Sequence, residues 1–295
     1  MRVLVAGAAG MLGLDVLRAG ERAGHELIGL ARPELDITNE ASVTAAIERA
    51  RPEAIVNCAA WTDVDGAESS PEAARAVNAD GAGNLARAAA AAGARLLHVS
   101  TDYVFDGEAP LGRDGRPRPY LEADPTAPRS AYGRTKLEGE RQVLACARQG
   151  GAGEAHTVAR SSWLFGTGGR NFAETMLTLA AERGRVAVVT DQVGCPTWTG
   201  HLAPALLGLL ERDVRGLVHL AGAGSVSWHG FAAEIFRQAE VDCPVDPATS
   251  AEMARPAPRP AWSTLESERG DVLPLPPWQD GLAGFLAARA GMMRA

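Results

Sequence analysis

The feature that most constrains the fold of this chain is an alternation of short apolar runs with helical stretches along its first 160 residues. Each apolar run fits a buried strand, and the stretch that follows has apolar residues at helical spacing. Apolar strands that alternate with helices are typical of a parallel sheet covered on both faces. The pattern therefore predicts an α/β fold with a doubly wound parallel sheet. The predicted strands are 2–6, 25–30, 53–59, 95–100 and 156–160, and the predicted helices are 11–24, near 39–50, near 71–92 and 130–148.

The alternation weakens after about residue 160, where longer loops separate the elements. The Pro-rich segments 244–262 and 273–278 indicate extended chain held against a neighbouring surface. We therefore expect a domain of residues 1–160 and a smaller C-terminal lobe of residues 161–295 that is interleaved with it. The elements expected in the second part are strands at 185–189 and 216–222 and helices near 199–212 and 228–239.

Residues 106–129 form a polar segment that is too long for a plain connection between two elements. Two interpretations stay open, a mobile lid and a disordered flap. The lid is favoured because the segment runs directly into the helix predicted at 130–148.

Charge and composition exclude several classes of partner. The formal net charge is -7 and the pI is near 5.5, so the chain has no basic footprint for nucleic acid or an anionic membrane. The four cysteines lie far apart and no two histidines have metal-ligand spacing, so neither a disulfide framework nor a metal site is indicated. The N-terminus begins a strand rather than a signal peptide, and no run of 18 apolar residues follows. We expect a cytoplasmic protein.

Three glycines stand between the first predicted strand and the first predicted helix. Gly7, Gly10 and Gly13 have the spacing G-x-x-G-x-x-G. In a dinucleotide site the first glycine permits a tight turn, the second lets the backbone approach a pyrophosphate, and the third allows close packing of helix on strand. The sequence therefore predicts a Rossmann-type fold in which the backbone around Gly10, Met11 and Leu12 contacts a dinucleotide.

The end of the second strand indicates which dinucleotide is bound. An acid that would bind the adenosine 2'-hydroxyl is missing, and the strand ends in Ala31 and Arg32. Arginine can pair with a 2'-phosphate, so NADPH is favoured, with NADH as an alternative cofactor. Arg32 as a solvated surface residue stays open. Asp36 and Ile37 could bracket the adenine, and the alternative for Asp36 is a turn or cap residue.

The segment "SAYGRTKLEGE" holds Lys136, the only lysine among 29 Lys and Arg residues, four positions after Tyr132. Residues four apart share one helix face, so both side chains should point into one crevice. An ammonium about 4 Å from a phenol, worth about 4 kcal/mol at an effective dielectric near 20, would lower the tyrosine pKa from about 10 to about 7. The pair therefore predicts a general acid, with a compact cation that can also hold ribose hydroxyls.

With the glycine triplet and this Tyr-x-x-x-Lys pair, the chain resembles the extended short-chain dehydrogenase/reductases. Further blocks, "STDYVFDG", "RSSWLFG", "NFAETML", "DQVGCPT" and "RPAWSTL", occur in the order typical of one branch, the reductases of dTDP-linked 4-ketosugars. The likeness extends from residue 1 to about 290. Departures from the pattern are the long 106–129 insertion, Cys195 and Ala31.

The resemblance implies roles for residues outside the two motifs. Thr101 takes the place of the third catalytic member and would hydrogen-bond the substrate carbonyl oxygen; the alternative is a plain strand-end threonine. Trp163 would offer a stacking surface for a sugar ring, and the alternative is core packing. Residues implied to line the cofactor are Ala60, Trp61, Thr62 and Val99, and those implied to touch the deoxysugar are Thr101, Asp102 and Trp163.

The reaction that the resemblance implies is reduction of the C4 ketone of dTDP-4-dehydro-L-rhamnose by NADPH, which gives dTDP-L-rhamnose. The C-terminal lobe would then bind the nucleotide sugar, and a homodimer is allowed. Three alternatives stay open: a reductase of another dTDP-4-ketohexose, a nucleotide-sugar epimerase or dehydratase, and a non-catalytic NADP-binding subunit. Family dehydratases place Asp-Glu after the threonine, but this chain has Asp102 and Tyr103 there, which argues against elimination.

Overall fold

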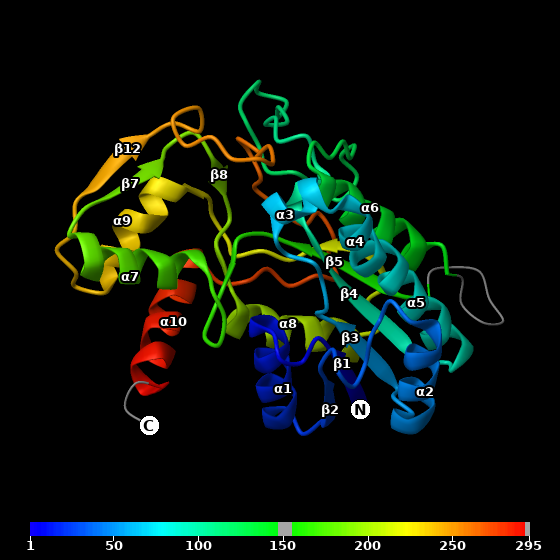
Figure 1. The fold of residues 1–295 in the computed structure, drawn as a ribbon. Helices are drawn as coiled ribbons and strands as arrows, with labels where there is room; N and C mark the ends of the chain where they lie inside the picture. The colour runs from blue at the N-terminus through cyan, green and yellow to red at the C-terminus, as the bar shows by residue number, and fades with distance from the viewer. Residues whose placement is uncertain (147–154, 293–295) are drawn as a thin grey trace.

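A sheet of six strands forms the centre of the molecule (Figure 1). The computed structural model describes residues 1–146 and 155–292. The strand order is β2-β1-β3-β4-β5-β10, and every neighbouring pair is parallel, so the predicted doubly wound parallel sheet is confirmed. The order of winding reverses at β1, which has β2 on one side and β3 on the other. The strands are β1 (Arg2–Ala6), β2 (Glu26–Leu30), β3 (Ala54–Asn57), β4 (Arg95–Thr101), β5 (Thr157–Ser161) and β10 (Gly216–His219).

Helices cover both faces of this sheet. On one face α1 and α8 pack through side chains such as Val16 and Leu206, which are fully buried. On the other face α2 and α5 pack through side chains such as Ile47 and Leu85, and α6 lies beside α5 (Figure 1). Two apolar cores therefore hold the sheet between them. The helices are α1 (Met11–Arg22), α2 (Glu40–Ala50), α5 (Gly81–Ala91), α6 (Ala131–Leu144) and α8 (Thr199–Glu211).

The prediction of a single helix near 71–92 is wrong in one respect, because a π-helical turn divides the helix. The segments are α4 (Pro71–Arg75), the π-helical turn Ala76–Asp80 and α5, and the short α3 (Val64–Ser69) precedes them. Asn78, within the turn, accepts a hydrogen bond from Trp61 N at 2.9 Å and donates one to Thr135 Oγ1 at 3.1 Å. The π-turn thus directs a buried amide between the loop after β3 and helix α6, and such turns occur often at functional sites.

A smaller lobe stands beside the sheet, to the left in Figure 1. Strands β7 and β12 pair in parallel, with Val186 opposite Val245, and three helices pack around them. The helices α7 and α10 were not predicted from the sequence. The chain is interleaved, since β10 and α8 from the second half complete the sheet and its cover. The lobe elements are α7 (Phe172–Arg183), β7 (Val186–Val189), α9 (Trp228–Gln238), β12 (Val245–Ala248) and α10 (Trp278–Met292), and the short pairs are β6 (Leu164–Phe165) with β9 (Thr197–Trp198) and β8 (Val193–Gly194) with β11 (Val226–Ser227).

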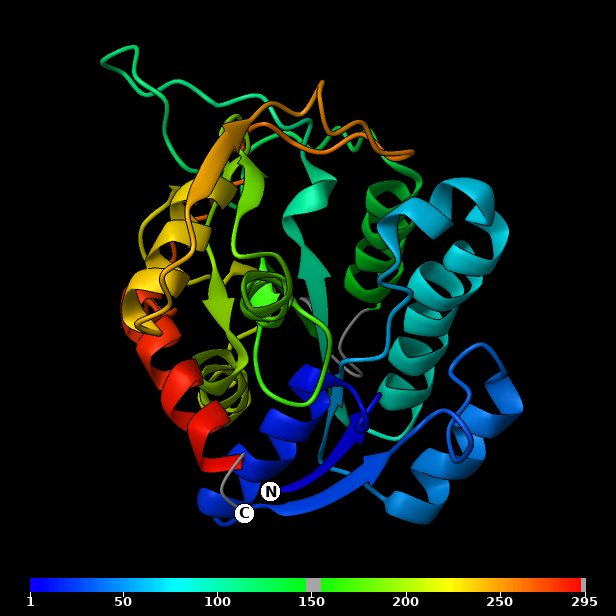
Figure 2. The same ribbon diagram turned by 60° about the vertical axis from the view of Figure 1, so that its left-hand side comes forward.

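Residues 106–129 form a flap that projects from the top of the molecule (Figure 2). Its base is fixed to the body because Tyr120 stacks on Phe105 with ring centroids 4.0 Å apart. Within it, Arg118 and Asp124 form a two-pronged ion pair at 2.6 and 2.7 Å. Its tip exposes 63% of Leu111. The structure therefore has an extended flap with an anchored base.

No helix in the described part of the chain combines the length and the apolar character that a membrane span requires.

Candidate active site

The glycine loop lies where the winding of the sheet reverses. Gly7 has φ of +75°, and a Cβ atom placed on it would lie 2.6 Å from the nitrogen of Ala59 in the loop after β3. Gly10 caps the N-terminus of α1 and is exposed, so the first N–H groups of that helix face the crevice. In open α/β sheets this reversal point is where a dinucleotide binds. The arrangement fits a pyrophosphate, because the cradle has no room for a side chain at Gly7.

A glycine-rich loop of the lobe, residues 166–169, approaches the same helix end. A Cβ atom on Gly169 would lie 3.0 Å from Cβ of Met11. The amide of Asn171 donates to the carbonyl of Gly166 at 2.8 Å and lies 3.8 Å from Sδ of Met11. This loop was not predicted from the sequence, although "FGTGGRN" with its three glycines was a visible signal.

Arg32 follows the end of β2 and is exposed, and its contact with a cofactor stays a prediction. Asp36 Oδ1 accepts hydrogen bonds from N and Oγ1 of Thr38, and these hold the pKa of Asp36 below its usual range. This is the turn role that the sequence left open. Ile37 is 4% exposed and packs in the core beside Gly81. A contact between Ile37 and adenine stays a prediction.

Helix α6 carries Tyr132 and Lys136 to the end of β4. The helix begins after Ser130, whose Oγ accepts a hydrogen bond from Gly133 N at 3.0 Å. Nζ of Lys136 reaches β4, where it donates to the carbonyl of Val99 at 2.7 Å and lies 3.2 Å from Nε2 of His98. The Lys136 side chain is only 2% exposed. The structure thus brings a buried cation and a tyrosine from one helix against a single strand end.

Thr101 completes this group at the end of β4. Its hydroxyl accepts a hydrogen bond from Tyr103 N at 3.2 Å and donates to Asp102 Oδ1 at 2.9 Å. The side chain of Thr101 neighbours that of Tyr132, and the ring of Tyr103 meets that of Tyr132 edge-on with centroids 5.5 Å apart. The side chain of Thr101 therefore both caps the end of β4 and lies beside Tyr132.

The pKa of Tyr132 differs from the expectation. Burial raises it to about 12, the hydrogen bond with Thr101 acts in the opposite direction, and the charge of Asp102 adds to the increase. The expected decrease towards 7 is wrong, because burial of the phenol is the largest effect on its pKa, and Nζ of Lys136 contacts Val99 and His98. Burial lowers the pKa of Lys136 to about 8. Spacing placed the two residues on one helix face but could not give the direction of the long lysine side chain.

Asp102 is a buried carboxyl group beside Thr101, only 2% exposed. Burial raises its pKa to about 6, while hydrogen bonds from Ser263 and Thr101 act in the opposite direction. Asp102 can therefore exist in both protonation states near neutral pH.

The loop after β3 contributes Ala60, Trp61 and Thr62. Trp61 is held by Asn78, as described above, and its Nε1 donates to the carbonyl of Asp63 at 2.9 Å. Trp61 and Tyr132 pack against one small apolar cluster. The loop therefore borders the Tyr132 group on the side of the glycine loop, and Thr62 is exposed.

Trp163 lies on the lobe side, with an unusual backbone. Its φ is +47°, a region that non-glycine residues rarely adopt outside constrained sites. Its ring stacks on Trp228 with centroids 3.4 Å apart and planes 3° apart, and Gly194 leaves space for it. The packing role that the sequence left open is present, and a sugar contact stays a prediction.

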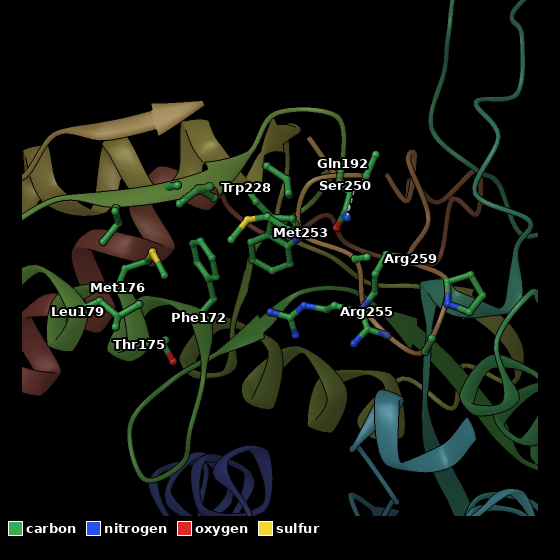
Figure 3. A pocket seen from close by; sticks show the side chains of 18 of the residues that line it. Phe172, Thr175, Met176, Leu179, Gln192, Trp228, Ser250, Met253, Arg255 and Arg259 are labelled. Carbon is green, nitrogen blue, oxygen red and sulfur yellow. Dashed lines mark hydrogen bonds between the residues drawn. The ribbon is translucent and has the colours of Figure 1, made fainter. Parts of the chain in front are cut away.

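A cavity of about 910 Å³ opens between α7, β7, the start of α9 and the strap of residues 250–259 (Figure 3). Tyr103 lines it, so it adjoins the Thr101 and Tyr132 group. Figure 3 shows an apolar side with Phe172, Met176 and Leu179, across from the strap side with Arg255 and Arg259. Five arginines line the cavity: Arg170, Arg183, Arg185, Arg255 and Arg259.

The strap connects the lobe to the sheet domain. Arg259 Nη2 lies 2.9 Å and Arg255 Nη1 3.7 Å from Asp65 Oδ2, and Ala257 N donates to Asp65 Oδ1 at 3.1 Å. These contacts with α3 agree with the prediction of extended chain held against a neighbouring surface. The two arginines were not predicted as site residues, and their position in "ARPAPRPAW" was the available signal.

Within residues 1–146 and 155–292, no group of three or more His, Cys, Asp or Glu side chains is placed to hold a metal ion. Cys58, Cys146, Cys195 and Cys243 are free thiols.

Known proteins resemble this chain over nearly its whole length. Residues 1–290 match a family model described as the RmlD substrate binding domain. The dTDP-4-dehydrorhamnose reductase of Mycobacterium tuberculosis is 44% identical, with 98% of this chain and 93% of the relative covered. A probable dTDP-4,6-dihydroxy-2-methyloxan-3-one 4-ketoreductase of Streptomyces antibioticus is 42% identical, with 96% and 93% covered. A crystal structure of dTDP-4-dehydrorhamnose reductase from Bacillus anthracis in complex with NADP has a TM-score of 0.89 at 35% identity, with 97% of this chain and 99% of that chain covered.

Proposed function

This chain belongs to the family of the RmlD substrate binding domain, and from that premise we propose that it reduces the C4 ketone of dTDP-4-dehydro-L-rhamnose to the alcohol of dTDP-L-rhamnose, with NADPH as reductant. It is an NAD(P)-dependent oxidoreductase of nucleotide-sugar biosynthesis, as the motif resemblance predicted. The observation that carries the proposal is the convergence of Thr101, Tyr132 and Lys136 between the glycine loop and the cavity of about 910 Å³.

The catalytic roles follow from these contacts. Tyr132 gives its phenolic proton to the oxygen that was the C4 ketone, and Thr101 hydrogen-bonds the same oxygen. With a pKa raised to about 12, Tyr132 carries its proton throughout the neutral range and can donate it when the oxygen becomes basic. Bound NADPH would supply the hydride, with its pyrophosphate at Gly7 and Gly10. Lys136 would hold the ribose hydroxyls.

We also propose that the two parts of the chain bind different ligands. Residues 1–160 bind the cofactor and carry the catalytic side chains, and residues 161–295 mainly bind the nucleotide sugar. The five arginines of the cavity support this division, because guanidinium groups bind phosphate oxygens with two parallel hydrogen bonds. The apolar side near Phe172 suits a thymine base.

The proposed substrate is a diffusible nucleotide sugar, and we propose a cytoplasmic enzyme that acts as a monomer or a homodimer. Sedimentation of the purified chain would distinguish the two states.

The direct test is NADPH oxidation with dTDP-4-dehydro-L-rhamnose, compared with the same sugar on UDP. We expect faster oxidation with the dTDP sugar and dTDP-L-rhamnose as the product. A second arm uses the dTDP-linked 4-ketosugar named for the Streptomyces antibioticus relative, because that protein is nearly as similar to this chain. Absence of oxidation with any 4-ketosugar would favour the non-catalytic NADP-binding subunit.

We predict that Arg32→Ala raises KM for NADPH at least about tenfold and changes KM for NADH much less, because the 2'-phosphate occurs only in NADPH. Steady-state kinetics with both cofactors measures this difference. Arg49→Ala, at an exposed position on α2, is the matched control and should change neither value. Equal losses for both cofactors would make Arg32 a surface residue.

We predict that Arg255→Ala raises KM for the dTDP sugar about tenfold with a small effect on kcat, because the strap arginine would bind the diphosphate and not the reacting carbon. The control is Arg116→Ala on the flap, where the side chain is 85% exposed. A KM within twofold of the wild-type value would remove Arg255 from the substrate site.

A further inference from the structure

A chain of buried hydrogen bonds leads from the loop after β3 to Lys136. The amide of Asn57 and the imidazole of His98 are each 1% exposed, and Asn57, the last residue of β3, pairs with His98 in the middle of β4. Asn57 Oδ1 lies 3.0 Å from Ala59 N, Asn57 Nδ2 lies 3.0 Å from His98 Nδ1, and His98 Nε2 lies 3.2 Å from Lys136 Nζ. Lys136 Nζ is also 2.7 Å from the carbonyl of Val99.

The direction of these hydrogen bonds is fixed at the Ala59 end. The backbone N–H of Ala59 can only donate, so the oxygen of the Asn57 amide must face it. The nitrogen of that amide therefore faces His98 and donates to Nδ1. A neutral imidazole that accepts at Nδ1 carries its only proton on Nε2. His98 is neutral, because burial first and the charge of Lys136 second hold its pKa well below the usual range.

His98 thus points an N–H group at Lys136. A neutral amine can accept this hydrogen bond with its lone pair and still donate to Val99. An ammonium has no lone pair, so one of the buried contacts must break or a donor must face a donor, and unmade buried hydrogen bonds are costly.

We propose that His98, oriented by Asn57, is a positioning residue that stabilises the neutral amine of Lys136, so that the amine and the ammonium come close in free energy. This inference extends the role of Lys136 in the proposed reduction, and its importance for catalysis rests on that proposed function. Tyr132 must regain a proton after each turnover, and an amine whose two forms are close in free energy can both give and take one.

The other titratable groups around Lys136 do not account for the stabilisation of its neutral form. Glu140, one turn later on α6, raises the pKa of Lys136, but its carboxylate is bound by Arg160 at 2.9 and 2.7 Å and by Ser100 at 2.5 Å. Cys58, after β3, is a buried thiol whose pKa is raised to about 12, so it stays neutral. No ion pair in the described part of the chain includes Lys136.

The test uses the fact that Lys136 is the only lysine. Protein labelled with [ε-¹³C]lysine gives one side-chain NMR signal, whose shift against pH reports the titration of Lys136. In His98→Gln the amide can turn its oxygen to the ammonium, so we expect the titration midpoint to rise by about one pH unit or more. In Asn57→Asp the carboxylate accepts from both Ala59 and His98, which reverses the imidazole, and we expect a rise as well.

The matched control is His156→Gln, another buried histidine, which contacts Leu96 N and Ala86 O and not Lys136. In that variant the titration midpoint of Lys136 should equal the wild-type value. An unchanged or lower midpoint in a folded His98→Gln or Asn57→Asp protein would overturn the proposal. A rise in His98→Gln carries the support, because the carboxylate of Asn57→Asp also stabilises the ammonium directly by its charge. The titration needs no substrate, so a protein that shows the shift without reductase activity would refute the proposed function and leave this inference standing.

Discussion

The Tyr132→Phe variant is expected to lose about 10²- to 10⁴-fold in kcat, the usual contribution of a positioned general acid. The ring packs beside Trp61 and Tyr103, and phenylalanine keeps that packing while it removes the hydroxyl. The variant should therefore fold normally and bind NADPH with nearly wild-type affinity. Single-turnover NADPH oxidation, together with NADPH titration by fluorescence, measures the two properties separately.

A suitable control is Tyr120→Phe, because the Tyr120 hydroxyl bonds Asp106 at 2.7 Å in the flap and not the site. We expect kcat for that variant within about threefold of wild type. If Tyr132→Phe kept most of its kcat with the chemical step limiting, the proton would have to come from elsewhere. Thr101 acting through a water molecule would be the next candidate.

The second large effect is expected at Lys136. Lys136→Met matches the length of the side chain without its charge, and we expect kcat/KM to fall at least about 10²-fold because the site loses its cation. Lys136→Arg keeps the charge but must fit a larger planar group into a side-chain site that is 2% exposed. We expect more than a tenfold loss of kcat there, with a lower Tm. Steady-state kinetics and thermal unfolding give these values.

Arg134→Lys, two positions earlier on an exposed face of the same helix, controls for exchange of these residue types and should be indistinguishable from wild type. Wild-type turnover in a well-folded Lys136→Arg protein would contradict the role assigned to the compact ammonium.

The pH dependence follows from the same residues. The pKa of Lys136 is lowered to about 8 and that of Tyr132 is raised to about 12. Activity that needs the ammonium of Lys136 and the phenol of Tyr132 is present at neutral pH and is lost as pH rises through about 8, where Lys136 loses its proton first. We expect an alkaline limb of kcat/KM near that pH. A limb that stays above pH 10 would mean that the charge of Lys136 is not required.

The sheet and the glycine loop could be predicted from the sequence because their signals are local. Fully apolar strands, Gly7 at the first turn and the i, i+4 pair of Tyr132 and Lys136 each depend on neighbours a few positions away. The features that could not be predicted depend on contacts between distant segments. Ile37 enters the core because Gly81 leaves it space, and Arg259 reaches the cavity on a strap fixed to Asp65.

The same reason explains the missed helices and the misjudged pKa. Helices α7 and α10 belong to the lobe core, where α7 packs on α9 and β7 and α10 packs on α8, α9 and β9, so their apolar residues do not make one clear stripe. The pKa of Tyr132 depends on the burial of its ring and on the direction that Lys136 takes. Neither can be read from the spacing of the two residues.

The interleaving of the chain has a consequence for dividing the protein into parts. A fragment that ended at residue 160 would lack β10 and would leave the edge of β5 unpaired. It would also lack α8, whose Leu202 and Leu206 are fully buried against one face of the sheet. The part proposed to bind the cofactor is therefore not an autonomous module that could be exchanged between enzymes at that boundary. A chimaeric enzyme that takes residues 1–160 from this protein would also need residues 199–219. A single junction in the sequence therefore cannot separate the two parts of the structure.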